Sequence, residues 1–157
     1  MDPVTIANEA TLIYDNITKN SNAVVTRILS LYDLTATKEA LLDSYTPGQT
    51  ITYITRVENT GSASLYNLTI VDDLANGTLQ YIDTSIEGYL NGSPIEIDVQ
   101  KTANTVTFKI DNVLNPNDNV LIIFETTTPT TNPEQITNTQ TITANGGSTT
   151  GPIVTAK

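Results

Sequence analysis

The stretch TPGQTITYITRVENTGSASLYNLTIVDDL, residues 46–74, constrains the fold more than any other part of the chain. It begins with a Pro-Gly turn, continues as an alternating segment from Ile51 to Val57, turns at Asn-Thr-Gly-Ser, and alternates again from Leu65 to Leu74. Alternation of apolar and polar residues with a period of two is typical of a strand with one buried face. This stretch therefore predicts two strands of a β-sheet protein.

The same pattern recurs at short intervals along the chain. We expect further strands over residues 4–14, 23–31, 34–40, 79–83, 86–90, 95–99, 105–110, 120–124, 136–144 and 153–156. Turn signals separate them, at residues 15–22, Asn76-Gly77, Asn91-Gly92 and Gly146-Gly147, and the Asn91-Gly92 pair is a strong hairpin signal.

No segment has a convincing helical period, so the sequence predicts an all-β fold, an immunoglobulin-like β-sandwich with an extra N-terminal β arm. Residues 1–31 form the arm in this interpretation, and residues 32–157 form the sandwich.

Composition excludes several classes of function. The formal net charge is −10 and the 7 basic residues are scattered, which argues against nucleic acid and anionic membranes as partners. The chain has no Cys and no His, so disulfides, thiolate metal sites and most hydrolase constellations are absent. We therefore expect no enzyme that turns over a substrate, no cofactor and no metal.

Two weaker signals concern metal binding and export. A loop with Asp111, Asn115, Asn117, Asp118 and Asn119 offers oxygen ligands for Ca²⁺, although such loops are usually only solvated. The first residues lack the basic and apolar regions of a signal peptide, and no apolar run approaches the length of a membrane helix. We expect no membrane insertion, and either a removed signal or release by another route, such as with a spore.

Three polar residues, Lys38, Asp72 and Asn138, share strand parity with apolar residues that face the core. Lys and Asp are almost never buried unless paired, so we expect the three side chains to be neighbours. A buried neutral Lys38 amine could attack the Asn138 carboxamide while Asp72, a catalytic acid, polarises it, forming an isopeptide bond and releasing ammonia. Two alternatives are a non-covalent buried cluster and exposed positions at strand ends.

A short sequence pattern occurs both in the arm and near the end of the sandwich. ITNTQTI (residues 136–142) repeats the spacing of Ile, Asn and Thr in IANEATL (residues 6–12). Chance in a chain rich in Asn and Thr is one interpretation. The other is that the arm supplies closing strands to a neighbouring copy by β-strand addition, with Asn8 as an alternative crosslink acceptor for the neighbour's Lys38.

The segments LTATKEA, PGQTITY, ENTG, TIVDDL and ITNTQTI resemble the bacterial conserved repeat domain, number eleven of the domains of unknown function. The resemblance covers residues 31–157. In related pilin-type domains that form an isopeptide, the Lys lies on the first strand, the Asp on a middle strand and the Asn on the last, which corresponds to Lys38, Asp72 and Asn138. Ala75-Asn76-Gly77 replaces the usual Pro, and Gln140 replaces the frequent Ala.

The resemblance implies an extracellular structural protein on a cell or spore surface. We expect a self-assembling subunit of a surface fibre or spore appendage, whose partners are copies of itself and a possible surface anchor protein. The alternative is an adhesive or spacer module of a larger cell-surface protein.

Overall fold

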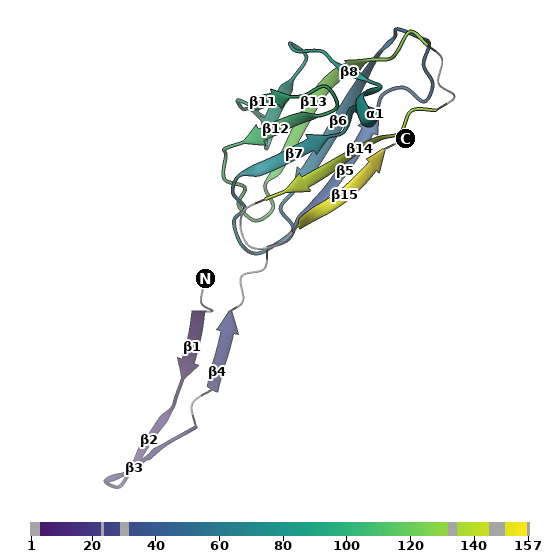
Figure 1. Cartoon of the computed structure of the whole chain (residues 1–157). Coiled ribbons are helices and arrows are strands. Elements are labelled where there is room, and N and C mark those ends of the chain that lie inside the picture. Colours follow the sequence, from purple (N-terminus) through teal and green to yellow (C-terminus); the bar gives the residue numbers. More distant parts are fainter. Residues whose placement is uncertain (1–3, 23, 29–31, 132–134, 145–149, 157) are drawn as a thin grey trace. The chain divides into compact units, whose positions relative to one another are not determined.

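The computed structural model describes residues 4–22, 24–28, 32–131, 135–144 and 150–156. The chain divides into two units, residues 1–31 and residues 32–157 (Figure 1). The predicted Gly146-Gly147 turn and the ends of the predicted strand at residues 23–31 lie outside the described residues.

The first unit is an antiparallel β ribbon in two parts. In the first part β1 pairs with β4, and in the second β2 pairs with β3; the strands are β1 (Val4–Asn8), β2 (Thr11–Tyr14), β3 (Ile17–Asn20) and β4 (Val24–Ile28). Asp15 and Asn16, with φ of 48° and 62°, form the two-residue turn between β2 and β3. The predicted turn over residues 15–22 was too long, because the chain after Asn16 pairs at once as β3.

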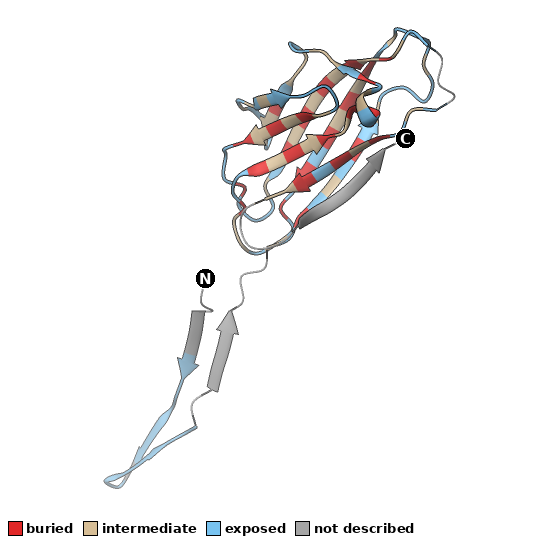
Figure 2. Ribbon diagram, in the orientation of Figure 1, coloured by how far each residue is buried: buried red, intermediate tan, exposed pale blue. Residues whose placement is uncertain are grey.

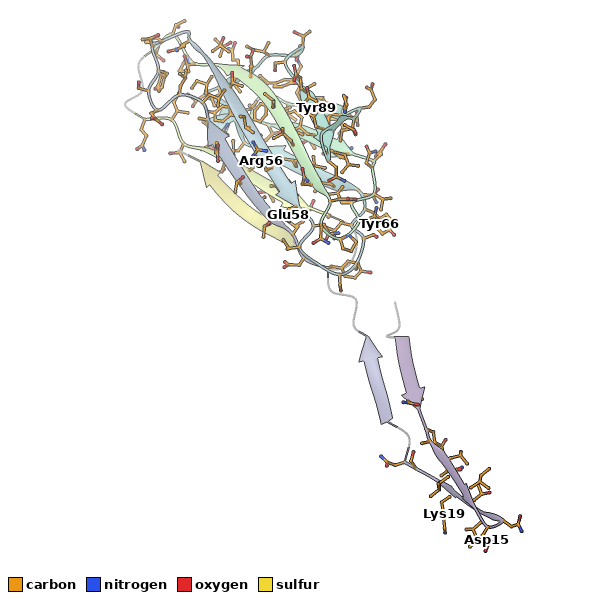
Figure 3. All side chains as sticks on the ribbon, turned by 180° about the vertical axis from the view of Figure 1, so that it is seen from behind. Asp15, Lys19, Arg56, Glu58, Tyr66 and Tyr89 are labelled. Carbon is orange, nitrogen blue, oxygen red and sulfur yellow. The ribbon has the colours of Figure 1, made fainter. Side chains whose placement is uncertain are left out.

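Apolar side chains lie on both faces of the β2–β3 ribbon. Leu12, Ile13 and Ile17 are 67%, 71% and 58% exposed. Leu12 is opposite Lys19 in the register, and Ile13 is opposite Thr18, so neighbouring apolar positions point to opposite faces. Figure 3 shows Lys19 beside the hairpin turn that contains Asp15. The ribbon therefore has no buried apolar face among its described side chains.

The second unit is a sandwich of two antiparallel sheets. The first sheet has the order β10-β9-β13-β6-β5, with β8 also paired to β13, and the second has the order β11-β12-β7-β14-β15. The first sheet consists of β5 (Thr35–Ala40), β6 (Thr50–Glu58), β8 (Gln80–Tyr81), β9 (Glu87–Leu90), β10 (Ser93–Pro94) and β13 (Asn119–Thr127). The second consists of β7 (Leu68–Asp72), β11 (Asp98–Lys101), β12 (Val106–Ile110), β14 (Asn138–Thr143) and β15 (Thr150–Ala156).

These sheets confirm the predicted all-β sandwich and correct one predicted strand. Asn91 and Gly92, with φ of 50° and 81°, form the expected hairpin turn. The strand predicted over residues 95–99 continues this hairpin beyond β10 by only one further backbone hydrogen bond, from the Ile95 N–H to the Gly88 carbonyl oxygen at 2.9 Å. The chain crosses to the second sheet instead, where it pairs as β11.

The core fills the space between the two sheets. Figure 2 shows buried and less buried residues alternating along β6, β7, β12 and β13, as expected for strands that cover a core with one face. The buried side chains include an aromatic cluster in which Phe124 lies 5.0 Å from Phe108 and 5.4 Å from Tyr53, measured between ring centroids. No helix among the described residues is long and apolar enough to cross a membrane.

A left-handed turn, α1 (Leu74–Gly77), follows β7 where the resembling domains have a Pro. The φ angles of Leu74, Ala75, Asn76 and Gly77 are 48°, 52°, 56° and 80°. Left-handed backbone costs L-residues about 1–2 kcal/mol each, so this turn is strained. The Asp73 carboxylate accepts a hydrogen bond from the Ala75 N–H at 2.9 Å and holds the turn. The sequence predicted a simple Asn76-Gly77 turn and missed this longer feature.

We predict that Ala75→Gly stabilises the sandwich by about 0.5–1 kcal/mol, because glycine adopts positive φ without steric cost and this gain exceeds the entropy lost from the unfolded chain. Urea unfolding of the two proteins measures the difference. Ala103→Gly is the matched control at an exposed alanine outside the positive-φ residues, and it should be neutral or destabilising. Destabilisation by Ala75→Gly would contradict a strained turn.

Candidate functional site

Polar side chains from both sheets meet inside the sandwich. β5 and β6 of the first sheet place Lys38 directly opposite Thr55. β7 and β14 of the second sheet place Asp72 directly opposite Gln140. These four residues alternate with outward-facing ones; Figure 3 labels Arg56, an exposed residue of β6 next to the buried Thr55. The period of two thus points a polar group inward from each of four strands.

Lys38 and Asp72 form an ion pair across the two sheets. The Lys38 Nζ lies 2.6 Å from the Asp72 Oδ2, and both side chains are fully buried. Burial lowers the pKa of Lys38, although the neighbouring Asp72 carboxylate opposes this change. The Lys38 Nζ also lies 4.7 Å from the centre of the Tyr53 ring and 5.9 Å from that of Phe124. The amine is therefore surrounded by one carboxyl group and two aromatic rings.

The Asp72 carboxyl group is held in one orientation by further donors. Gln140 Nε2 donates to Oδ2 at 2.9 Å, and the Leu74 backbone N–H donates to Oδ1 at 3.0 Å. Gln140 is itself fixed, because its Oε1 accepts a hydrogen bond from the Thr55 hydroxyl at 2.8 Å. A continuous chain of buried hydrogen bonds thus runs from Thr55 through Gln140 and Asp72 to Lys38.

Asn138 lies in the same interior but is not held in this way. It precedes Gln140 by two residues on β14 and therefore faces the same side, diagonal to Asp72. Its side chain is buried, with 1% of the residue exposed, and neither Oδ1 nor Nδ2 has a hydrogen-bond partner among the described residues. A buried amide without partners costs free energy and is uncommon in folded proteins, so it calls for an explanation.

The beginning of β14 is fixed by Asp73, next to Asp72. The Thr139 N–H donates to Asp73 Oδ1 at 3.1 Å, the Thr139 hydroxyl donates to Asp73 Oδ2, and the Asp73 N–H donates to the Thr139 carbonyl oxygen at 3.1 Å. Thr139 is adjacent to Asn138. Asp73 therefore connects the end of β7 to the residue beside the unpartnered amide.

The structure places the residues expected from the sequence as follows. Lys38 and Asp72 are in direct contact, and Asn138 is buried near them, so none of the three lies at an exposed strand end. Asn8 is exposed in the first unit. Sequence reasoning missed the roles of Tyr53 and Thr55, although both have core-facing parity in the strand that was predicted over residues 51–57.

The acidic loop considered for Ca²⁺ forms hydrogen bonds within the protein. Asp118 accepts one from Asn91 Nδ2 at 2.7 Å and one from the Asn115 N–H at 2.7 Å. The bond from Asn91, followed by the one from Asn115, lowers the pKa of Asp118. Among the described residues, no group of three or more acidic side chains is arranged to hold a metal ion.

The fold is shared with pilin and adhesin domains of Gram-positive bacteria. The major pilin SpaD from Corynebacterium diphtheriae matches with a TM-score of 0.62 and 14% identity, over 78% of this chain and 33% of that chain. The major pilin subunit BcpA of Bacillus cereus matches with a TM-score of 0.60 and 12% identity, over 94% of this chain and 47% of that chain. The chain thus spans less than half the length of either pilin.

A collagen-binding domain from a Staphylococcus aureus adhesin matches with a TM-score of 0.51 and 17% identity, over 80% of this chain and 94% of that domain. No family model matches the chain, and a search of curated proteins gives no match. Identities this low establish the fold alone. Membership of the conserved repeat family therefore stays a prediction from sequence.

We predict that Asp72→Ala destabilises the sandwich by about 3–5 kcal/mol or more, because it leaves the buried Lys38 amine without its partner. The double variant Lys38→Met/Asp72→Leu, which leaves no buried charge, should recover part of this loss. Urea unfolding measures both. Asp83→Ala is the matched control, because it removes the exposed ion pair with Lys101 and should change stability by less than about 1 kcal/mol. A double variant no more stable than Asp72→Ala would contradict the account.

Proposed function

We propose that the chain is a structural module of a microbial surface, whose sandwich is locked by an isopeptide bond between Lys38 and Asn138. The observation that carries the proposal is the buried, unpartnered carboxamide of Asn138 in the same interior as a buried amine with a lowered pKa. A covalent bond between the two removes both the buried amine and the unpartnered amide. Burying either group unreacted costs free energy, so the unreacted state is destabilised relative to the crosslinked one.

The reaction uses the proton that Lys38 and Asp72 share. When the proton resides on Asp72, the neutral Lys38 Nζ attacks Asn138 Cγ and forms a C–N bond. Asp72 gives its proton to the amide nitrogen, the bond between Cγ and that nitrogen breaks, and ammonia leaves. Asp72 recovers a proton from Nζ, so it ends as it began. One amine and one carboxamide give one isopeptide bond and one ammonia molecule, and the chain acts once on itself rather than as an enzyme.

Burial and fixed position take the place of an external catalyst. Water is excluded from the site, and burial lowers the pKa of Lys38, which favours the neutral amine that the attack requires. The hydrogen bonds from Gln140 and Leu74 hold the Asp72 carboxyl group in place before reaction. Preorganisation of this kind lowers the entropic cost of bringing the reacting groups together.

A covalent link at this place suits a load-bearing module. Lys38 lies on β5, the first strand of the sandwich, and Asn138 is the first residue of β14, the second-to-last strand. The link would join the two sheets and close a loop that contains almost the whole unit. Together with the fold shared with pilins, this supports a structural role in a fibre or appendage on a cell or spore surface, with copies of the chain as partners.

The N-terminal unit supplies a route to assembly. An isolated two-stranded ribbon is only marginally stable in water, and this one exposes Leu12, Ile13 and Ile17. The ribbon would gain stability by adding its strands to the sheet of a second copy. In an alternative form of the crosslink, Lys38 of one copy reacts with Asn8 of another copy instead of with its own Asn138. This reaction gives covalent multimers.

An adhesive module of a longer surface protein is the second candidate. The match to almost the entire collagen-binding domain of an adhesin favours it. Binding of the sandwich to immobilised collagen, together with a monomeric state that is independent of residues 1–31, would support this function over a fibre subunit.

We predict that the purified, denatured protein is lighter than its sequence by the mass of one ammonia molecule. Lys38→Ala and Asn138→Ala remove the reacting groups, and Asp72→Ala removes the acid, so each variant should have its full calculated mass. Intact-mass spectrometry makes the measurement, with Asp83→Ala as a control, because Asp83 is an exposed aspartate outside the site and the variant keeps all three groups. Full mass for the unaltered protein would refute the crosslink.

We predict that Ile13→Asp prevents self-association, because it places a charge on an apolar position that would be buried against a second copy. Light scattering and electron microscopy of the unaltered and altered proteins are the measurements. Asn16→Asp is the control, since it adds the same charge in the exposed turn between β2 and β3, outside the paired strands. Covalent multimers that survive boiling in detergent would indicate the crosslink between Asn8 of one copy and Lys38 of another. Fibres unchanged by Ile13→Asp and by deletion of residues 1–31 would exclude assembly through the arm.

A further inference from the structure

We propose that Tyr53 is a second catalytic residue of this crosslinking reaction: its hydroxyl donates a hydrogen bond to the Asn138 carboxamide oxygen as negative charge develops there, while its ring shields the Lys38 amine from water. This inference rests on the proposed isopeptide bond and names a residue that the pattern of Lys, Asp and Asn does not contain.

The first observation is the position of the Tyr53 ring. Tyr53 is diagonal to Lys38 across the β5–β6 pair, and the Lys38 Nζ lies 4.7 Å from the ring centre. Phe124 is the direct partner of Tyr53 on β13 and stacks on its ring with a centroid distance of 5.4 Å, and the Lys38 Nζ lies 5.9 Å from the Phe124 ring as well. The Tyr53 ring is thus packed against a second ring beside the amine that it covers.

The second observation concerns the other end of the same side chain. Burial raises the pKa of Tyr53 to about 12, and a side-chain interaction with Asn138 opposes this rise. The hydroxyl therefore lies beside the Asn138 carboxamide and is protonated at neutral pH. An interaction that lowers the pKa of a phenol is one in which the phenol oxygen faces the carboxamide N–H, so the carboxamide must turn over before the hydroxyl can donate to its oxygen. No hydrogen bond of ordinary geometry holds either polar atom of that carboxamide among the described residues. The carboxamide can thus turn its oxygen toward the hydroxyl.

The two contacts place Tyr53 between the reacting groups, with its ring at the nucleophile and its hydroxyl at the electrophile. Attack by Nζ on Cγ moves an electron pair onto the carboxamide oxygen, and this oxyanion needs a donor until the C–N bond to the leaving nitrogen breaks. Asp72 can polarise the carboxamide only until it gives its proton to the leaving nitrogen, so the oxyanion needs a second donor that keeps its proton throughout the step. A hydrogen bond that is weak before attack and strong in the tetrahedral state accelerates the step.

Tyr53→Phe tests the hydroxyl alone, because phenylalanine keeps the ring and its stacking on Phe124. The protein is synthesised in a cell-free extract, translation is stopped, and samples are denatured at intervals for intact-mass analysis. Loss of ammonia should be slower than in the unaltered chain by about tenfold or more, the scale on which a single oxyanion donor acts. Equal rates in the two proteins would overturn the proposal.

Tyr81→Phe is the matched control. Its ring belongs to the same aromatic cluster, 5.9 Å from Phe108 and 6.4 Å from Phe124, and its hydroxyl is also buried. This variant should lose ammonia at the unaltered rate. An equal slowing by Tyr81→Phe and Tyr53→Phe would show a general effect of core packing and would overturn the specific role of Tyr53.

A rescue experiment separates a catalytic role from a folding defect. A ring-fluorinated tyrosine introduced at position 53 by codon suppression keeps the hydroxyl, so it should restore the rate above that of Tyr53→Phe. Failure of this rescue would contradict the proposal even if the phenylalanine variant is slow. If the unaltered chain itself loses no ammonia, the isopeptide bond fails; if it does and Tyr53→Phe matches it, only the role of Tyr53 fails.

Discussion

The contact between Lys38 and Asp72 is the interaction on which the rest of the structure depends. Two fully buried charged groups, 2.6 Å apart, join the first sheet to the second at a place where an apolar pair would pack at lower cost. Around this pair lie Gln140, Thr55 and two aromatic rings. A buried pair with such surroundings is weak evidence for stability by itself, and it is stronger evidence for chemistry.

The strained turn after β7 belongs to the same arrangement. Leu74 adopts left-handed backbone, and its N–H is the donor that orients the Asp72 carboxyl group. Asp73 then joins this turn to the start of β14, one residue from Asn138. Strain in the backbone thus lies next to the residues that would react, where it helps to fix them. By the chain-entropy argument used for disulfides, a crosslink that closes a loop of about 100 residues contributes about 4–5 kcal/mol, which is comparable to this strain.

Much of the fold could be predicted from alternation alone. The period of two located β5, β6, β12 and β13 to within a few residues, because each covers the core with one face. Of the strand predicted over residues 95–99, only residues 98 and 99 are in a strand, β11, whereas Ile95 and Ile97 pack against the core from the segment before it and so imitate a strand. Alternation also missed the left-handed turn, since nothing in Leu74 or Ala75 favours positive φ. The carboxylates of Asp72 and Asp73, which accept from the Leu74 and Ala75 N–H groups, support that conformation.

Parity likewise indicated Lys38, Asp72 and Asn138 but not their surroundings. Sequence alone cannot show which inward-facing residues of two sheets meet, so Gln140 stood out only as a replacement for the frequent Ala and not as a donor to Asp72. The sequence did not single out Tyr53, because its proximity to both Lys38 and Asn138 depends on the offset between the sheets. The sequence shows which residues of a strand share a face, whereas contacts across the core are visible only in the structure.

Peptide mapping tests the central claim most directly. Trypsin cannot cleave after a Lys38 whose amine is in an amide bond, so digestion of the denatured protein should release residues 28–56 joined to residues 110–157. Fragmentation of this branched peptide should locate the link between Lys38 and Asn138, with one ammonia molecule missing. Separate linear peptides, one ending at Lys38 and one containing an intact Asn138, would contradict the account.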